Sequence, residues 1–164
     1  MTIGEFSTAA PDWRGLQSTV EAGWVVVAET GNGRLQQAML DGRHLLLADE
    51  PAAFGGADVG PSPYELLLMA LGSCTSMTLR LYAARKEWEL RRVVVRMRHR
   101  RVHAEDCADC EKMGGLDRIE RTIELVGELD AEQRRRLLEI ADMCPVHRTL
   151  TSSVDIRTAS YAPG

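Results

Sequence analysis

The sequence predicts an α+β domain with the element order β-β-β-α-β-β-α-β. Three observations predict it: short apolar strands precede a Gly- and Pro-rich loop, one long apolar helix follows, and two alternating strands lead into an amphipathic helix. With 164 residues, 45% of them hydrophobic, the chain is long enough to bury a core of ordinary size. We expect residues 1–16 to form a flexible N-terminal arm and residues 17–164 a single domain.

The first three strands are predicted between residues 23 and 48. Their sequences are GWVVVAE (23–29), RLQQAML (34–40) and DGRHLLLA (41–48). The GNG stretch at 31–33 and the pair Asp41-Gly42 are turn signals, so these strands form an antiparallel meander. The stretch DEPAAFGGADVGPSP (49–63) is a loop.

A long helix is predicted from about residue 64 to residue 86. Ser62, Pro63 and Glu65 occupy the N-cap, N1 and N3 positions, which is the pattern of a capping box. The first half of this helix is apolar nearly all round, and such a helix is enclosed by other elements.

The second half of the chain predicts two strands, a helix and a last strand. In residues 90–103, Val93, Val95 and Met97 share one face with His99, while arginines occupy the other. In RIERTIELVGEL (118–129), the alternation places Ile119, Ile123 and Leu125 inward. Asp130 and Gln133 open a helix with the apolar stripe Leu137, Ile140, Ala141 and Cys144; Pro145 interrupts it, and SSVDIRT (152–158) closes as a strand.

Charge and composition exclude some functions. A net charge of −4 argues against nucleic-acid binding by bulk charge, and we interpret the basic run RRVVVRMRHRR (91–101) as a solvated strand face. We find no apolar stretch of ~18 residues to span a bilayer, and no signal sequence at the N-terminus, so we expect no membrane partner and a cytoplasmic location. There the cysteines at 74, 107, 110 and 144 would be reduced thiols.

Two of these cysteines occupy comparable places. Cys74 lies in the predicted apolar helix beside Ser73, Thr75 and Ser76, and Cys144 ends the stripe of the second helix. Each is either a small buried hydrophobe or one member of a redox pair, in which one thiol is oxidised and the other condenses with it. The hydroxyls around Cys74 either donate to its sulfur or bond back to helix carbonyls.

The stretches GPSPYELLLMALGSCTS (60–76) and CPVHRTL (144–150) resemble the two cysteine motifs of the OsmC/Ohr family of thiol-dependent peroxidases. The likeness covers roughly residues 20–158. It implies an OsmC-like intertwined homodimer, with central helices packed between two sheets. It also implies that Cys74 attacks an organic hydroperoxide to become a sulfenic acid, that Cys144 resolves it as a disulfide, and that a small dithiol or lipoyl-type reductant reopens the disulfide, with no cofactor required.

The chain departs from the family pattern where the peroxidases carry a Glu that anchors an activating arginine. That position is Tyr64 here, and Glu65 follows it. Glu65 either replaces the family Glu or caps the helix, and Tyr64 either binds a peroxide oxygen or packs at the dimer seam. Arg34 and Arg43 are candidates for the arginine. His147 either tunes the Cys144 thiol or caps a helix end.

The stretch HRRVHAEDCADCE (99–111) resembles a less studied branch of the same family. His103, Cys107 and Cys110 are the type of ligands that bind zinc, whereas His99 lies ~13 Å from His103 along a strand. A dithiol that relays electrons and a loop without chemistry are the other interpretations. The alternative function is therefore a non-peroxidatic domain that binds an acyl or thiol-bearing small molecule and carries a zinc-binding loop.

Overall fold

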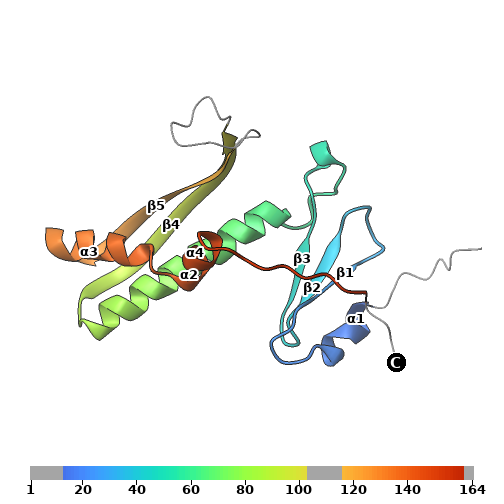
Figure 1. The fold of residues 1–164 in the computed structure, drawn as a ribbon, viewed down its shortest axis with the longest axis horizontal. Coiled ribbons are helices and arrows are strands. Elements are labelled where there is room, and N and C mark those ends of the chain that lie inside the picture. Colours follow the sequence, from blue (N-terminus) through green and yellow to red (C-terminus); the bar gives the residue numbers. More distant parts are fainter. Residues whose placement is uncertain (1–12, 103–115, 161–164) are drawn as a thin grey trace, which may run out of the picture. The chain divides into compact units, whose positions relative to one another are not determined.

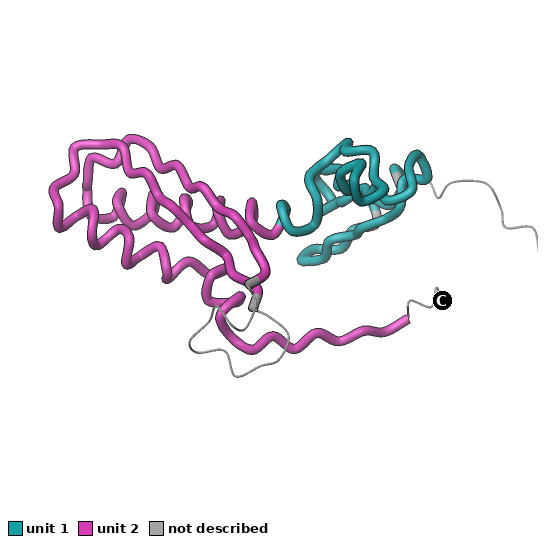
Figure 2. Tube along the Cα trace, turned by 90° about the horizontal axis from the view of Figure 1, so that it is seen from above, with its two compact units in different colours: residues 1–66 teal, residues 67–164 magenta. Residues whose placement is uncertain are grey.

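The computed structural model describes residues 13–102 and 116–160, and the described part has the α+β architecture that the sequence predicts (Figure 1). The chain divides into two compact units, residues 1–66 and residues 67–164 (Figure 2). The helices are α1 (Trp13–Leu16), α2 (Pro63–Arg85), α3 (Ala131–Ala141) and α4 (Pro145–Leu150), with the 3₁₀ turns η1 (Gln17–Thr19) and η2 (Ala52–Phe54). The strands are β1 (Val26–Glu29), β2 (Gln37–Leu40), β3 (Leu45–Ala48), β4 (Glu89–Val102) and β5 (Leu116–Glu128).

Most of the predicted N-terminal arm, residues 1–12, lies outside the described residues, and α1 forms at its end. The extent of the single domain therefore stays a prediction.

The first unit contains the predicted meander, with β1, β2 and β3 paired antiparallel in that order. The hairpin between β2 and β3 turns at Asp41-Gly42, as the sequence predicts. The Asp41 carboxylate accepts hydrogen bonds from the backbone N–H groups of Arg43 and His44, at 2.9 and 2.6 Å. Gly42 adopts a φ of +85°, which glycine tolerates without strain.

The loop between β3 and α2 is organised by a buried carboxylate. Asp49 accepts hydrogen bonds from the backbone N–H groups of Glu50, Ala57 and Val59. Burial raises the pKa of Asp49, but the three hydrogen bonds outweigh it and lower that pKa below its usual value. A side chain at Gly56 would collide with the Glu50 carbonyl oxygen, so only glycine fits there. These contacts lead the chain to Ser62, where α2 begins.

Helix α2 is buried along one face and open on the other. Leu71, Thr75, Leu79 and Ala83 recur every four residues and are the buried positions. Met69, Met77 and Leu81 are exposed, Leu81 by 67%. The expectation that other elements enclose this helix is therefore wrong for a single chain, because no element of the described residues covers this second face.

Helix α2 also corrects the expectation that no segment is apolar enough to span a bilayer. Among the described residues, Pro63–Arg85 alone has the length and hydropathy for it, with a mean hydropathy of 1.3. Length and composition carry little weight here, since the core helix of a soluble protein meets the same criterion.

Strands β4 and β5 form a long antiparallel hairpin, with Val93 opposite Leu125 and Val95 opposite Ile123. On the exposed face, the arginines of β4 pair with glutamates of β5. The pairs are Arg96 with Glu124, at 3.0 Å, and both Arg98 and Arg100 with Glu120. The interpretation of the basic run as a solvated strand face is confirmed.

The core of the second unit lies where α2, the hairpin and α3 meet. Its buried residues are Leu79, Ala83, Leu90, Leu137, Ile140 and Ala141. The predicted capping box opens α3, with Asp130 accepting from the Gln133 N–H at 2.8 Å and the Gln133 side chain accepting from the Asp130 N–H. This cap sets the start of α3 and directs its apolar stripe toward the core.

The last predicted strand does not form. Residues 153–160 have neither helix nor strand, and Ile156 is 84% exposed. Val154 and Ile156 alternate with polar residues, but a strand exists only when it hydrogen-bonds to a neighbour. Within the described part of the chain, no strand pairs with this segment.

Replacing Leu137 with alanine should destabilise the protein. Leu137 is fully buried in the core, so Leu137→Ala leaves a cavity and should lower the free energy of unfolding by about 2–5 kcal/mol. The neighbouring Leu138 is about half exposed, and Leu138→Ala should cost less than about 1 kcal/mol. Urea denaturation followed by circular dichroism measures the free energy of unfolding of both variants. Equal losses would contradict the orientation of α3 that buries Leu137 and exposes Leu138.

Candidate redox site

The second unit places Cys144 at the turn between α3 and α4. It is the N-cap residue of α4, and its side chain is fully buried. Its Sγ atom accepts a hydrogen bond from the backbone N–H of His147 at 3.3 Å. The predicted stripe of α3 thus ends at Cys144, although the helix itself stops at Ala141.

A hydroxyl of α2 reaches the same sulfur. The Oγ1 atom of Thr75 lies 3.6 Å from the Sγ atom of Cys144, within the range of a weak sulfur hydrogen bond. The same hydroxyl donates to the carbonyl oxygen of Leu71 at 2.8 Å. Thr75 is fully buried, so this contact connects the middle of α2 to the turn before α4.

An arginine that the sequence reasoning missed completes this cluster. Arg121 of β5 donates to Thr75 Oγ1 at 2.9 Å and to the carbonyl oxygen of Ala141 at 3.2 Å. Its other terminal nitrogen pairs with Asp142 at 2.6 Å, and its side chain is only 13% exposed. The alternation of side chains along the strand was the available signal. Arg121 stands between Ile119 and Ile123, both predicted to face inward, and therefore shares their face.

Cys74 immediately precedes Thr75 and is half-buried. Cys74 and Cys144 are both free thiols. Neighbouring α-carbons are about 3.8 Å apart, so Cys74 flanks the residue that contacts Cys144. Successive side chains of a helix diverge by about 100°, so Cys74 points along a different direction from Thr75. The two predicted thiols therefore belong to one region but are not bonded.

The hydroxyls around Cys74 serve the helix backbone. Ser73 donates to the Ala70 carbonyl oxygen at 3.1 Å, and Thr78 donates to that of Cys74 at 2.8 Å. Of the two interpretations of Ser73 and Thr75, bonding back to the helix is the one observed. Thr75 in addition contacts Cys144.

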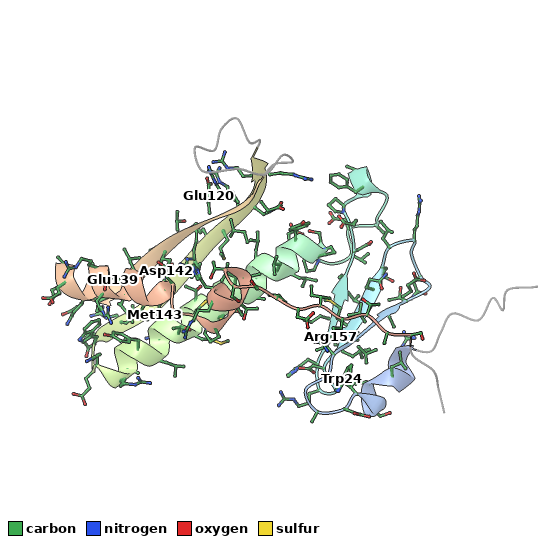
Figure 3. The ribbon with its side chains drawn as sticks, in the orientation of Figure 1. Trp24, Glu120, Glu139, Asp142, Met143 and Arg157 are labelled. Atoms are coloured by element: carbon green, nitrogen blue, oxygen red, sulfur yellow. The ribbon has the colours of Figure 1, made fainter. Side chains whose placement is uncertain are left out.

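A cavity of about 390 Å³ adjoins the cluster. Its apolar wall comes from α2, β4, β5 and α4, and its polar groups come from β5 and the α3–α4 region. The lining residues are Leu71, Met97, Asp117, Ile119, Arg121, Asp142, His147, Leu150 and Thr151. Figure 3 labels Asp142 and Met143 at the turn beside which this cavity lies.

A family model described as "OsmC-like protein" matches residues 55–159, more than half of the chain. The chain belongs to the OsmC family. Cys74, Cys144 and the Thr75 cluster lie inside the matched segment. The curated proteins that we searched include none that matches it.

Solved structures agree with this assignment. A putative osmotic stress induced and detoxification response protein from Psychrobacter arcticus is 20% identical, with a TM-score of 0.60 over 76% of this chain and 85% of that one. An organic hydroperoxide resistance protein OsmC from Legionella pneumophila is 20% identical, with a TM-score of 0.57 over 82% and 95%. The organic hydroperoxide resistance protein OhrB of Bacillus subtilis is 20% identical, with a TM-score of 0.55 over 80% and 92%. At this identity the likeness establishes the OsmC fold.

The other candidate residues that resemblance to the OsmC family indicated lie in the first unit. The Glu65 carboxylate accepts from the N–H and the hydroxyl of Ser62, at 2.8 and 2.9 Å. The Ser62 N–H bond, followed by the hydroxyl bond, lowers the pKa of Glu65. Glu65 thus caps the start of α2, as one of its two interpretations proposes. Tyr64, Arg34 and Arg43 are exposed.

His147 contacts Cys144 through its backbone, while its ring Nδ1 lies 3.8 Å from the Asp142 carboxylate. The choice between tuning the Cys144 thiol and capping a helix end stays a prediction for this histidine.

The predicted zinc ligands His103, Cys107 and Cys110 lie outside the described residues. His99, which is described, contacts Asp117 through its Nε2 atom at 2.8 Å. In residues 13–102 and 116–160, no group of three or more His, Cys, Asp and Glu side chains is arranged to hold a metal. Zinc binding by the loop stays a prediction.

The difference in burial predicts different labelling rates for the two thiols. We expect iodoacetamide to modify Cys74 at least about tenfold faster than Cys144, because Cys144 reacts only after a local opening, and an opening that costs about 1.4 kcal/mol slows labelling tenfold. Peptide-resolved mass spectrometry measures each rate. In concentrated urea the two rates should converge; faster labelling of Cys144 in the native protein would contradict the burial.

Proposed function

We propose that this OsmC family member is a thiol-dependent peroxidase that reduces organic hydroperoxides, with Cys74 as the attacking thiol and Cys144 as the resolving thiol. The observation that supports it best is the contact between Thr75, the neighbour of Cys74, and the buried sulfur of Cys144. Both thiols are reduced, and Arg121, which donates to Thr75, lines a cavity with an apolar wall. Two solved relatives are named for organic hydroperoxide resistance, which points to the same substrates.

The proposed reaction has three steps. The Cys74 thiolate attacks the terminal peroxide oxygen, the O–O bond breaks, and the alkoxide leaves with a proton as an alcohol. Cys144 then attacks the sulfur of the Cys74 sulfenic acid, forming a disulfide and releasing water. A small dithiol or lipoyl-type reductant reopens the disulfide by thiol–disulfide exchange. No resident cofactor is needed, and the chemistry suits the reducing cytoplasm, where we place the protein.

The unequal burial of the thiols fits these roles. Cys74 is half-buried and can receive a peroxide, whereas the buried Cys144 is shielded from direct oxidation. Cys144 must leave its place to reach Cys74. It lies at a turn before a helix of six residues, and the local shift must open its backbone hydrogen bonds to Ala141, at 3.5 Å, and from Arg148, at 3.1 Å.

We further propose that the protein is a homodimer in which the open face of α2 is covered. Met69, Met77 and Leu81 are exposed on that face. In the first unit, Val27 and Leu46 are both paired with Met39, so they lie on the same side of the sheet. Both are exposed as well. Large apolar side chains exposed side by side typically mark an interface.

The alternative function, a non-peroxidatic domain that binds an acyl or thiol-bearing small molecule, keeps specific support. Tyr64 stands where the family peroxidases carry Glu, and Glu65 is already engaged by Ser62. In this alternative the cavity beside Arg121 is the ligand site, and Cys74 is not oxidised.

Peroxide should consume two thiols per chain in the wild-type protein. With stoichiometric cumene hydroperoxide, we expect a Cys74–Cys144 disulfide, because the sulfenic acid of Cys74 has a resolving thiol nearby. The variant Cys144→Ser should instead accumulate the sulfenic acid, which dimedone labelling and mass spectrometry detect.

Cys74→Ser is the matched control, since it keeps Cys107, Cys110 and Cys144. Its thiols should be consumed more slowly than those of the wild type. Equal thiol loss in Cys74→Ser, or unchanged thiol titres in the wild type, would favour the binding domain instead.

Charge on the open face of α2 should dissociate the dimer. Leu81→Asp places an unpaired carboxylate in the proposed interface, so the dimer dissociation constant should rise by about thirtyfold or more, equivalent to about 2 kcal/mol. Sedimentation velocity measures it. Thr122→Asp, on the exposed face of β5, is the control and should leave association unchanged; a monomeric wild type would refute the proposal.

A further inference from the structure

The Thr75 hydroxyl is a buried group with three polar neighbours. Its Oγ1 atom lies 2.8 Å from the Leu71 carbonyl oxygen, 2.9 Å from Nη1 of Arg121 and 3.6 Å from Sγ of Cys144. A hydroxyl has one proton and two lone pairs. The arginine can only donate, so one lone pair of Oγ1 accepts from Arg121. The hydroxyl proton and the second lone pair are left for Leu71 and Cys144.

The protonation of Cys144 decides how these hydrogen bonds are arranged. While the thiol keeps its proton, Thr75 donates to Leu71, and the S–H group donates to the free lone pair of Oγ1. A thiolate has no proton to donate and accepts strongly. The hydroxyl can then rotate to donate to the sulfur, where the His147 N–H already donates at 3.3 Å. In its resting position, before the shift that brings it to Cys74, the thiolate would therefore have two donors.

Arg121 keeps the hydroxyl at this place. The guanidinium is fixed by the carbonyl oxygen of Ala141 and by the carboxylate of Asp142, both within three residues of Cys144. It therefore joins β5, α2 and the α3–α4 turn through one planar group. Its donation to Oγ1 leaves the hydroxyl proton free for either Leu71 or the sulfur.

We propose that Thr75 is a catalytic residue of the disulfide-forming step and that Arg121 is its positioning residue. This inference rests on the proposed peroxidase function. In the step, the Cys144 thiolate attacks the sulfur of the Cys74 sulfenic acid, the S–O bond breaks, and the leaving hydroxide takes up the proton that Cys144 has lost, giving water. Thr75 donates to the attacking sulfur before the new S–S bond forms. The peroxide of the preceding step is the only oxidant required.

The test is a single turnover of the full chain with one equivalent of cumene hydroperoxide. Mass spectrometry after rapid quenching with dimedone follows the sulfenic acid of Cys74 and the disulfide separately. Thr75→Val removes the hydroxyl and keeps the shape of the side chain. Because a hydrogen bond to a charged group is lost, we expect the sulfenic acid to convert to the disulfide about ten- to a hundredfold more slowly.

Two variants separate this role from a structural one. Thr75→Ser restores a hydroxyl and should bring the conversion rate back to within about threefold of the wild type. Thr78→Val removes a hydroxyl that also bonds to a carbonyl of α2, that of Cys74, and should leave the conversion rate unchanged. Arg121→Gln keeps an amide donor without the charge and should slow the conversion with Thr75 in place, which tests the proposal even if Thr75→Val does not fold.

The outcomes are distinguishable. If Thr75→Val and Arg121→Gln both convert the sulfenic acid as fast as Thr78→Val does, this inference is wrong and the peroxidase function stands. If the wild-type protein forms neither sulfenic acid nor disulfide, the proposed function is wrong, and the assignment of Thr75 and Arg121 is wrong with it.

Discussion

The contact of Arg121 with Thr75 and Asp142 is the interaction on which the arrangement of the candidate redox site depends. A single guanidinium, nearly buried, joins α2, β5 and the turn that carries Cys144. Burying a cation is costly unless its donors are satisfied. Here a hydroxyl, a carbonyl oxygen and a carboxylate satisfy them, so the position of the turn and the position of the arginine require each other.

The same region separates two thiols by their access to solvent. Cys74 and Thr75 are neighbours on α2, but the helical rotation between them sends only Thr75 to the buried sulfur of Cys144. A reduced protein with this arrangement exposes one thiol and protects the other. In a peroxidase, this order lets the substrate meet the attacking thiol first and the resolving thiol only after a local shift.

The open surfaces of the chain set a second constraint. Helix α2 contributes a buried face to the core and leaves Met77 and Leu81 uncovered, and the C-terminal segment leaves Ile156 uncovered. These exposed apolar side chains would lower the solubility of an isolated chain. The proposed homodimer would cover the exposed apolar side chains of α2, which no element in the described part of one chain covers.

The sequence by itself determined the elements whose signals are local. The Asp41-Gly42 turn, the Asp130–Gln133 capping box and the alternation of β4 and β5 depend on residues a few positions apart, and the structure confirms each. Two motifs with Cys74 and Cys144 were enough to predict the OsmC family. Alternation along β5 already indicates an inward face for Arg121, but tertiary structure alone decided which groups it bonds, because its acceptors come from α2 and the α3–α4 turn, 46 and 20–21 positions away. It also decided that residues 152–158 form no strand, because alternation indicates a strand's faces but cannot supply the neighbouring edge to which it must hydrogen-bond.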